Sequence, residues 1–231
     1  MNPIRIFLDL TKAYDILNHK VLLSKLHYYG IRGVANFWFE SYLSHRKQCV
    51  EINNTDKGIR ISTTKEIKHG GPQGSILGPI LFSLYINDLS LNITGTKIVL
   101  FADDTNILVT DGNINNLRYK LNNVMTDLQT WFTLNNLIVN TEKTLRVSFH
   151  TLQNKKYVTP QVTFAGRDIP YNSETKFLGI YLNENMKCNN HIKYLNSELN
   201  TSYCMISTLK NITSLHVLRT MYFACFHAHL R

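Results

Sequence analysis

The sequence lacks the features of membrane and secreted proteins. No apolar run approaches the ~18 residues that a membrane-spanning helix needs. The N-terminus, MNPIRIFLDL, has no basic segment followed by a long apolar stretch and a small-residue cleavage site, so no secretory signal is recognisable. We therefore expect a protein that stays inside the cell, nuclear or cytoplasmic and not secreted, with no membrane partner.

Cysteine is scarce, and its four positions are far apart, at Cys49, Cys188, Cys204 and Cys225. No CxxC spacing occurs, so neither a disulfide framework nor a zinc cluster is predicted. Cys188 and His191 are three residues apart, but a zinc site needs about four ligands. We expect reduced thiols and no disulfides.

Acidic residues are few, with 16 against 25 basic ones, and the net charge is +9. Residues 1–142 carry 14 basic and 12 acidic side chains, whereas residues 143–231 carry 11 and 4. A positive excess on one portion fits a polyanionic partner such as nucleic acid. A solvated basic surface without a partner explains it equally well.

With 44% hydrophobic and 18% charged residues over 231 positions, the chain is predicted to be globular. The apolar pattern indicates an α+β fold, in which a mixed sheet is backed by helices and followed by a helical tail. Helices are expected before Gly30, over residues 34–43, from Ile114 to Trp131, and from about His191 onward. Residues 76–89 are apolar on nearly all sides and fit a buried helix, provided that Pro79 lies in its first turn. Strands are expected at residues 6–8, 97–101, 107–109, 145–149, 162–164 and 177–181, with a hairpin that turns at Asn53-Asn54.

Three aspartates stand at the ends of apolar runs. Asp9 follows residues 6–8, and Asp103-Asp104 lies at the tip of a predicted hairpin in the stretch FADDT. If the two strands are neighbours the carboxylates converge, and like charges about 4 Å apart repel by roughly 4 kcal/mol at an effective dielectric near 20. Mg²⁺ or Mn²⁺ would offset this repulsion, since these ions favour oxygen ligands. An aspartate pair also forms turns without any metal, and the spacing alone leaves both interpretations open.

Five blocks of the sequence, in order, resemble the reverse transcriptase domain of non-LTR (LINE-type) retrotransposons. They are FLDLTKAYD (7–15), GGPQGSILGPILFSLYINDL (70–89), FADDT (101–105), a block with Trp131, Asn135, Leu137, Asn140, Lys143 and Thr144, and KFLGIYLN (176–183). The resemblance covers about residues 4–195. It implies a polymerase right hand whose palm, a mixed or antiparallel sheet backed by helices, is joined by partial fingers and the start of a helical thumb.

On this resemblance, residues 1–17 and 70–185 form the palm, and the second of these segments includes a primer-grip hairpin. Residues 18–69 form a fingers-side insertion, and residues 186–231 form the start of a truncated thumb. Because the chain begins eight residues before Asp9, we expect a fragment without the basic fingers segments that hold a triphosphate, weak or inactive alone.

The resemblance implies RNA-directed DNA polymerase activity, with two Mg²⁺ ions (or Mn²⁺) supporting nucleotide transfer from a dNTP to a primer 3′-hydroxyl. Asp9, Asp103 and Asp104 would be the catalytic metal ligands, and the carbonyl of Leu10 would add a contact. The partners would be an RNA template, a DNA primer and dNTPs.

Further roles follow from the same resemblance. Tyr14 matches the aromatic position that excludes a ribose 2′-hydroxyl, and Gln73 and Gly74 match a loop that contacts the incoming nucleotide and the template. Lys143 matches a lysine that would donate a proton or charge to the leaving pyrophosphate. A core aromatic, a plain turn before a helix and a solvated lysine are the respective structural alternatives.

Phe177, Leu178 and Gly179 match the hairpin that grips the primer end. A non-catalytic nucleic-acid-binding transposon remnant, which uses the basic portion from Lys143 onward, is the main alternative function. An RNA-templated RNA polymerase is disfavoured by Tyr14 and by Ala102, where such enzymes usually carry glycine.

Overall fold

The computed structural model describes residues 2–54, 58–72, 74–151, 153 and 160–230. Its contacts divide the chain into two units, Met1–Arg146 with Val158–Tyr171 and Val147–Tyr157 with Asn172–Arg231. No helix of the described ranges is long and apolar enough to cross a membrane.

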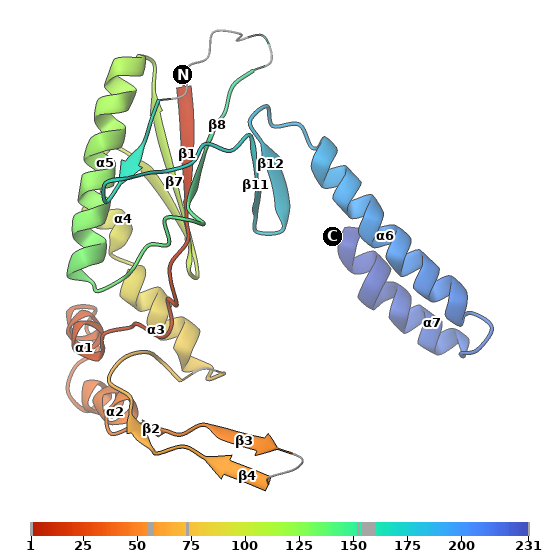
Figure 1. Ribbon diagram of the computed structural model, residues 1–231, viewed down its shortest axis with the longest axis horizontal. Coiled ribbons are helices and arrows are strands. Elements are labelled where there is room, and N and C mark those ends of the chain that lie inside the picture. Colours follow the sequence, from red (N-terminus) through yellow and green to blue (C-terminus); the bar gives the residue numbers. More distant parts are fainter. Residues whose placement is uncertain (1, 55–57, 73, 152, 154–159, 231) are drawn as a thin grey trace. The chain divides into compact units, whose positions relative to one another are not determined.

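The first unit holds most of a four-stranded sheet in the order β6-β7-β1-β8 (Figure 1), and the boundary between the units falls within the edge strand β8. β1 (Asn2–Leu8) and β6 (Lys97–Phe101) both pair antiparallel with β7 (Asp104–Asp111), and β8 is Leu145–Ser148. The β1–β7 register sets Ile6 opposite Ile107, and both are completely buried. Since opposed residues share a face of the sheet, this pair defines the core face. The predicted strands before Asp9 and on both sides of FADDT are confirmed.

The helix α5 (Ile114–Leu134) packs on β7 and lies along the sheet (Figure 1). Its Leu117, Leu121 and Leu128 are fully buried in the same cluster as Ile6 and Ile107. The helix begins where the Asn113 side chain accepts a hydrogen bond from the Asn115 amide at 2.8 Å, which satisfies one of the free N–H groups of the first turn. The amphipathic pattern that predicted this helix is therefore confirmed.

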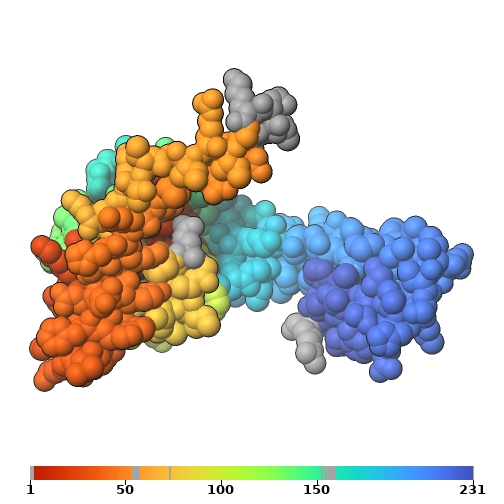
Figure 2. All heavy atoms as spheres, turned by 90° about the horizontal axis from the view of Figure 1, so that it is seen from below, coloured from red at the N-terminus to blue at the C-terminus, as the bar shows by residue number. Residues whose placement is uncertain are grey.

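Helices and short strand pairs make up the rest of the first unit. α1 (His19–Tyr28) and α2 (Val34–Leu43) form where helical spacing was predicted. The short strands are β2 (Lys47–Gln48) with β5 (Lys65–Glu66), β3 (Glu51–Asn54) with β4 (Gly58–Ile61), and β9 (Thr163–Phe164) with β10 (Arg167–Asp168). In Figure 2 the β3 and β4 strands, in orange, project beside α1 and α2 in red and orange.

Two predictions within this unit are wrong. Asn53 and Asn54 do not form the hairpin turn, because Asn53 pairs with Ile59 and the strand ladder continues through both residues. The apolar run 76–89 is not one buried helix, since α3 (Leu77–Ile86) ends before α4 (Leu89–Asn92) begins. Ile76 and Ile80 are also exposed, so the run buries a single face. Pro79 does lie in the first turn of α3, where it needs no N–H partner.

The second unit contains a hairpin followed by helices. β11 (Glu174–Phe177) and β12 (Ile180–Asn183) pair across a two-residue turn at Leu178-Gly179, so the single strand expected over 177–181 is wrong. Both turn residues have positive φ, 48° and 84°, which reverses the chain there. α6 (Asn189–Leu209) and α7 (Leu215–Met221) follow, then a π-helical segment (Tyr222–Phe226) and a 3₁₀ turn (His227–Leu230). The helical tail is confirmed.

A partly buried lysine joins three helices of the first unit. Lys25 of α1 donates from Nζ to the Tyr85 carbonyl and to Asp88 Oδ1, both at 2.6 Å. The same Nζ lies 4.9 Å from the centre of the Tyr85 ring and 4.7 Å from that of Trp131 in α5. Burial lowers the pKa of Lys25, and the hydrogen bond and charge of Asp88 oppose this change. One cation thereby links α1, α3 and α5 through charge, carbonyl and aromatic contacts.

Replacing this lysine tests its structural role. We expect Lys25→Met to destabilise the first unit by about 1–3 kcal/mol, because Asp88 loses its cation and the Tyr85 carbonyl loses its donor. The melting temperature should fall by roughly 3–8 °C, measured by the fluorescence of Trp38 and Trp131. Lys120→Met, which removes the more exposed Lys120–Asp111 pair, is the matched control and should cost less than about 1 kcal/mol. Equal losses in the two variants would contradict the role given to Lys25.

Candidate active site

The strand register brings Asp9 and the Asp103-Asp104 pair to one end of the sheet. β1 and β7 pair Phe7 with Asn106 and Leu8 with Thr105. Asp9 and Asp104 are the next residues in that direction, so the register sets them opposite each other on the face that carries Phe7. Asp9 is half-buried and Asp104 is exposed.

The backbone of Asp9 is held by a segment more than 130 residues later. The Asp9 carbonyl accepts a hydrogen bond from the Asn140 amide at 2.8 Å, and the Asp9 amide donates to Thr144 Oγ1 at 3.3 Å. Next to it, Leu10 forms an antiparallel bridge with Val139. The hydrogen bonds of this bridge use the flanking residues, so the Leu10 carbonyl takes part in neither. These hydrogen bonds therefore fix the backbone of Asp9 at the point where the chain leaves β1.

The turn between β6 and β7 presents the aspartate pair. Ala102 has a φ of 52°, a left-handed conformation that costs energy for any residue with a side chain. Although Asp104 is largely exposed, partial burial of its carboxylate raises its pKa, and the charges of Asp103 and Asp9 raise it further. The structure thus brings the three carboxylates close enough to interact electrostatically.

These carboxylates have no cationic partner among the described residues. The ion pairs found there, Lys25–Asp88 and Lys120–Asp111, are both elsewhere. Across the same described ranges, no group of three or more histidine, cysteine, aspartate or glutamate side chains is spaced to hold a metal ion. Within those ranges the three aspartates are therefore not arranged as a closed set of metal ligands.

Tyr14 lies close to the aspartate pair. Its ring packs on Phe82 of α3 with centroids 4.9 Å apart, and its pKa is raised by burial and then by the charge of Asp103. Tyr14 also lines a cavity of about 370 Å³, together with Gly71, Pro72, Gly74, Ser75, Gly78 and Pro79. The structure therefore brings Tyr14 and Gly74 to one cavity, and the charge of Asp103 acts on the Tyr14 side chain.

The glycine-rich loop has a strict steric requirement at Gly70. Its φ is 83°, and a Cβ there would lie 2.7 Å from the Asp15 carbonyl oxygen. Gly74 also has a positive φ, of 77°, but a Cβ there would meet open space. Gln73, predicted to contact the nucleotide, lies outside the described residues.

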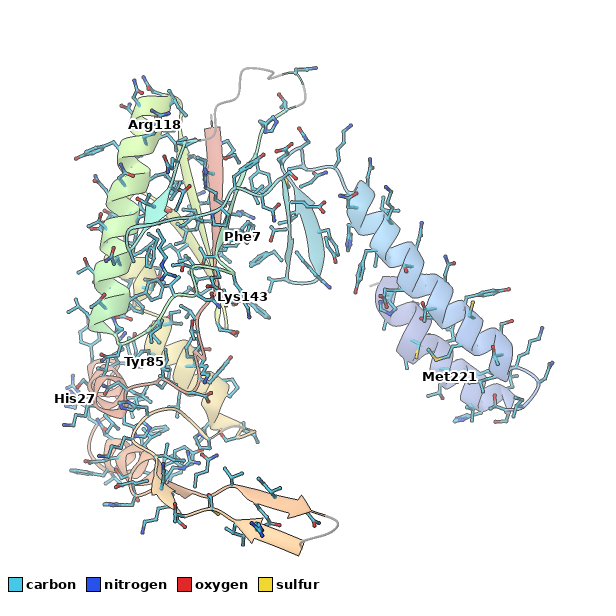
Figure 3. The ribbon with its side chains drawn as sticks, in the orientation of Figure 1. Phe7, His27, Tyr85, Arg118, Lys143 and Met221 are labelled. Atoms are coloured by element: carbon cyan, nitrogen blue, oxygen red, sulfur yellow. The ribbon has the colours of Figure 1, made fainter. Side chains whose placement is uncertain are left out.

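Other predicted site residues are described by their own surroundings alone. Lys143 is exposed, in a turn where Asn140 Oδ1 accepts the Glu142 and Lys143 amides at 3.1 and 3.3 Å. Figure 3 shows Lys143 beside the end of β1 at which Phe7 lies. Phe177, Leu178 and Gly179 belong to the second unit, and Leu178 is half-exposed at the hairpin turn. The primer-grip role stays a prediction.

Several residues with clear positions in the site were given no role from the sequence. Thr144 is completely buried and holds the Asp9 amide. Ser75 Oγ donates to the Pro72 carbonyl at 2.8 Å and accepts from the Gly78 amide at 3.0 Å, which shapes the loop before α3. An Asn followed by polar residues is a turn signal, and it could have drawn attention to Asn140. No local sequence pattern indicated that Thr144 would form a hydrogen bond with the Asp9 amide.

Comparisons with known proteins agree with this arrangement. Residues 2–182 match the family described as reverse transcriptase (RNA-dependent DNA polymerase). The chain is 29% identical over 201 residues to the probable RNA-directed DNA polymerase from transposon BS of Drosophila melanogaster, which covers 81% of this chain and 21% of that protein. It is also 29% identical over 210 residues to the RNA-directed DNA polymerase from mobile element jockey of the same species, with 88% and 22% covered. The chain thus spans about a fifth of the length of these curated relatives.

The fold is also similar to solved structures. Apo telomerase from Candida tropicalis, truncated from its C-terminal domain, superimposes with a TM-score of 0.53 at 15% identity, over 80% of this chain and 35% of that one. This likeness supports the mixed helix-and-sheet fold of a reverse transcriptase. Since the sequence match extends over most of the chain and includes both strands that carry the aspartates, the chain belongs to the reverse transcriptase (RNA-dependent DNA polymerase) family.

Proposed function

We propose that this chain is the catalytic core of a retrotransposon RNA-directed DNA polymerase, which adds dNTPs to a primer 3′-hydroxyl opposite an RNA template. The observation that carries the proposal is the β1–β7 register, which sets Asp9 opposite Asp104 at the end of the sheet. The names of the relatives, RNA-directed DNA polymerases of mobile elements, support the same reaction. We assign the four-stranded sheet to the palm, the segment with β2–β5 to the fingers side and α6–α7 to the start of the thumb.

The chemistry of the three aspartates fits a pair of Mg²⁺ ions. All the donors are carboxylate oxygens, which this cation prefers. Burial, and then the charges of Asp103 and Asp9, raise the pKa of Asp104, so ionisation of all three carboxylates is unfavourable without a cation. Asp9, Asp103 and Asp104 would hold the ions, with the Leu10 carbonyl as a further donor. When bound, two such ions supply activation of the primer 3′-hydroxyl and stabilisation of charge on the departing pyrophosphate.

The remaining side chains bind and orient the substrates. We assign Tyr14 to exclusion of the ribose 2′-hydroxyl, with its ring against the sugar, and Gly74 to close backbone approach by the nucleotide in the cavity that Tyr14 lines. Lys143, exposed beside the end of β1, would donate a proton to the leaving pyrophosphate. Phe177, Leu178 and Gly179 would hold the primer terminus through backbone and apolar contacts.

The first test is primer extension with Mg²⁺, an RNA template and an annealed DNA primer. We expect slow dNTP incorporation that Asp103→Asn lowers by about 10²–10³-fold, because a lost ligand weakens transition-state stabilisation by several kcal/mol. Asp127→Asn, an exposed aspartate on α5, is the matched control and should extend like the wild type. Undiminished extension by Asp103→Asn would refute the site. A wild type that binds nucleic acid with steep salt dependence but extends no primer would support the non-catalytic remnant instead.

The second test concerns sugar discrimination. Tyr14→Ala should increase incorporation of ribonucleotides relative to deoxynucleotides by about 10–100-fold, because removal of the ring opens space for the 2′-hydroxyl. Tyr14→Phe keeps the ring and should keep the discrimination. The ratio of kcat/KM for a ribonucleotide and its deoxy counterpart measures both. Equal ratios in the wild type and Tyr14→Ala would remove Tyr14 from the sugar-binding role.

The third test uses stability and needs no activity. The folded-state pKa of Asp104 is raised, so protonation of Asp104 stabilises the folded state. This contribution is fully present below pH 3.8, the ordinary pKa of the group, and is lost as the pH rises through the folded-state pKa. At pH 7 the ionised group is repelled by Asp9 and Asp103, and Asp104→Asn should raise the melting temperature by about 1–3 °C.

The gain from Asp104→Asn should shrink as the pH falls toward 3.8. Millimolar Mg²⁺ should stabilise the wild type more than Asp104→Asn, since the ion binds the folded carboxylates. Asp127→Asn serves again as the control and should show neither effect. An Asp104→Asn variant that is less stable than the wild type at pH 7 would mean that the repulsion is compensated.

A further inference from the structure

Two distant backbone segments of the first unit are in direct contact beside the nucleotide cavity. The Gly70 amide donates to the Leu17 carbonyl at 2.8 Å, and the Gly71 amide donates to the Tyr14 carbonyl at 3.0 Å. The approach is so close that a Cβ on Gly70 would overlap the Asp15 backbone. The loop that begins at Gly70 is thus held against the segment that carries Tyr14 by two backbone hydrogen bonds.

One side chain adds a further hydrogen bond to this contact between the two segments. His19 Nε2 lies 2.8 Å from the Gly70 carbonyl oxygen. Because a carbonyl only accepts, Nε2 carries the proton and donates it to this bond. His19 is the first residue of α1, and Asn18 Oδ1 caps that helix by accepting from the amides of Lys20 and Val21 at 3.0 and 3.3 Å. The imidazole therefore extends from a fixed helix start to the carbonyl of a loop residue.

The loop separates two cavities. Gly71 and Pro72 line the cavity of about 370 Å³ that also contains Tyr14 and Gly74. The same two residues line a second cavity of about 500 Å³ on the side of Asp15 and Arg46. A loop displaced toward either side would narrow one cavity and widen the other. Its position is consequently a determinant of the shape of the nucleotide site.

We propose that His19 is a positioning residue for nucleotide binding, which acts through the Gly70 carbonyl and holds the loop at the correct distance from Tyr14. The catalytic consequence of this inference rests on the proposed polymerase function. The hydrogen bond that holds the loop is a property of the fold itself. Glutamine tests the mechanism, since its side-chain amide can donate from a place close to that of Nε2. Leucine fills similar space and donates nothing.

The hydrogen bond that holds the loop is tested by amide hydrogen exchange. In His19→Leu the amides of Gly70 and Gly71 should exchange about tenfold faster than in the wild type, because one hydrogen bond between the two segments is lost. The α5 amides should remain slow, which shows that the fold persists. His19→Gln should restore slow exchange at both glycines. The control is His27→Leu, on an exposed position of the same helix (Figure 3), and it should leave exchange unchanged.

The catalytic consequence is tested by steady-state extension with dTTP. His19→Leu should raise KM for dTTP about tenfold with kcat within about twofold, and His19→Gln should recover most of the loss. Unchanged exchange in His19→Leu, an unchanged KM, or failure of glutamine to rescue would each overturn the proposal. If the wild type extends no primer, the polymerase function fails. The exchange measurements and equilibrium binding of dTTP then decide the role of His19 on their own.

Discussion

The pairing register of β1 with β7 is the constraint on which the candidate site depends. Successive residues of a strand point to opposite faces, so a slip of one residue would send Phe7 and Asp9 to the core side and Ile4, Ile6 and Leu8 to the other face. What prevents the slip is the core itself, because Ile4, Ile6 and Leu8 must all remain under the helices. The position of the carboxylates is therefore determined by apolar side chains that never contact a substrate.

Regular features of the fold could be predicted from the sequence because they depend on neighbours along the chain. The period of α5, the strand ending at Asp9 and the hairpin around FADDT are all visible as local apolar patterns. The turn assigned to Asn53-Asn54 was wrong for a related reason: asparagines are common in turns, but nothing local revealed that the ladder to β4 continues through them.

Long-range contacts were out of reach of such patterns. The contact of Gly70 with Asp15, the bond from Thr144 to Asp9 and the Lys25 contacts with Asp88 and Trp131 each join segments that no periodicity relates. The motifs indicated which residues would meet, as with Tyr14 and Asp103, because the family resemblance carries spatial information that composition lacks. They did not indicate what would hold those residues in place, which is why His19 and Thr144 went without a role.

The start of β7, together with the turn before it, combines several energetically costly features. Ala102 is in a left-handed conformation, Asp104 is repelled by two other carboxylates, and both side-chain amide atoms of the buried Asn106 lack a hydrogen-bond partner within the described part of the chain. Fixed polar groups of this kind are expected where a site is organised in advance of its ligands.

The hold of Asn140 and Thr144 on Asp9 also has a consequence for biosynthesis. The ribosome adds Asp9 before the two residues that hydrogen-bond to its backbone, which follow after 131 and 135 further residues. Until then the nascent chain has β1 without the two hydrogen bonds that fix the Asp9 backbone. Contacts between residues so far apart in the sequence form slowly. A polypeptide released prematurely before residue 140 would carry all three aspartates and still lack the brace for the first of them.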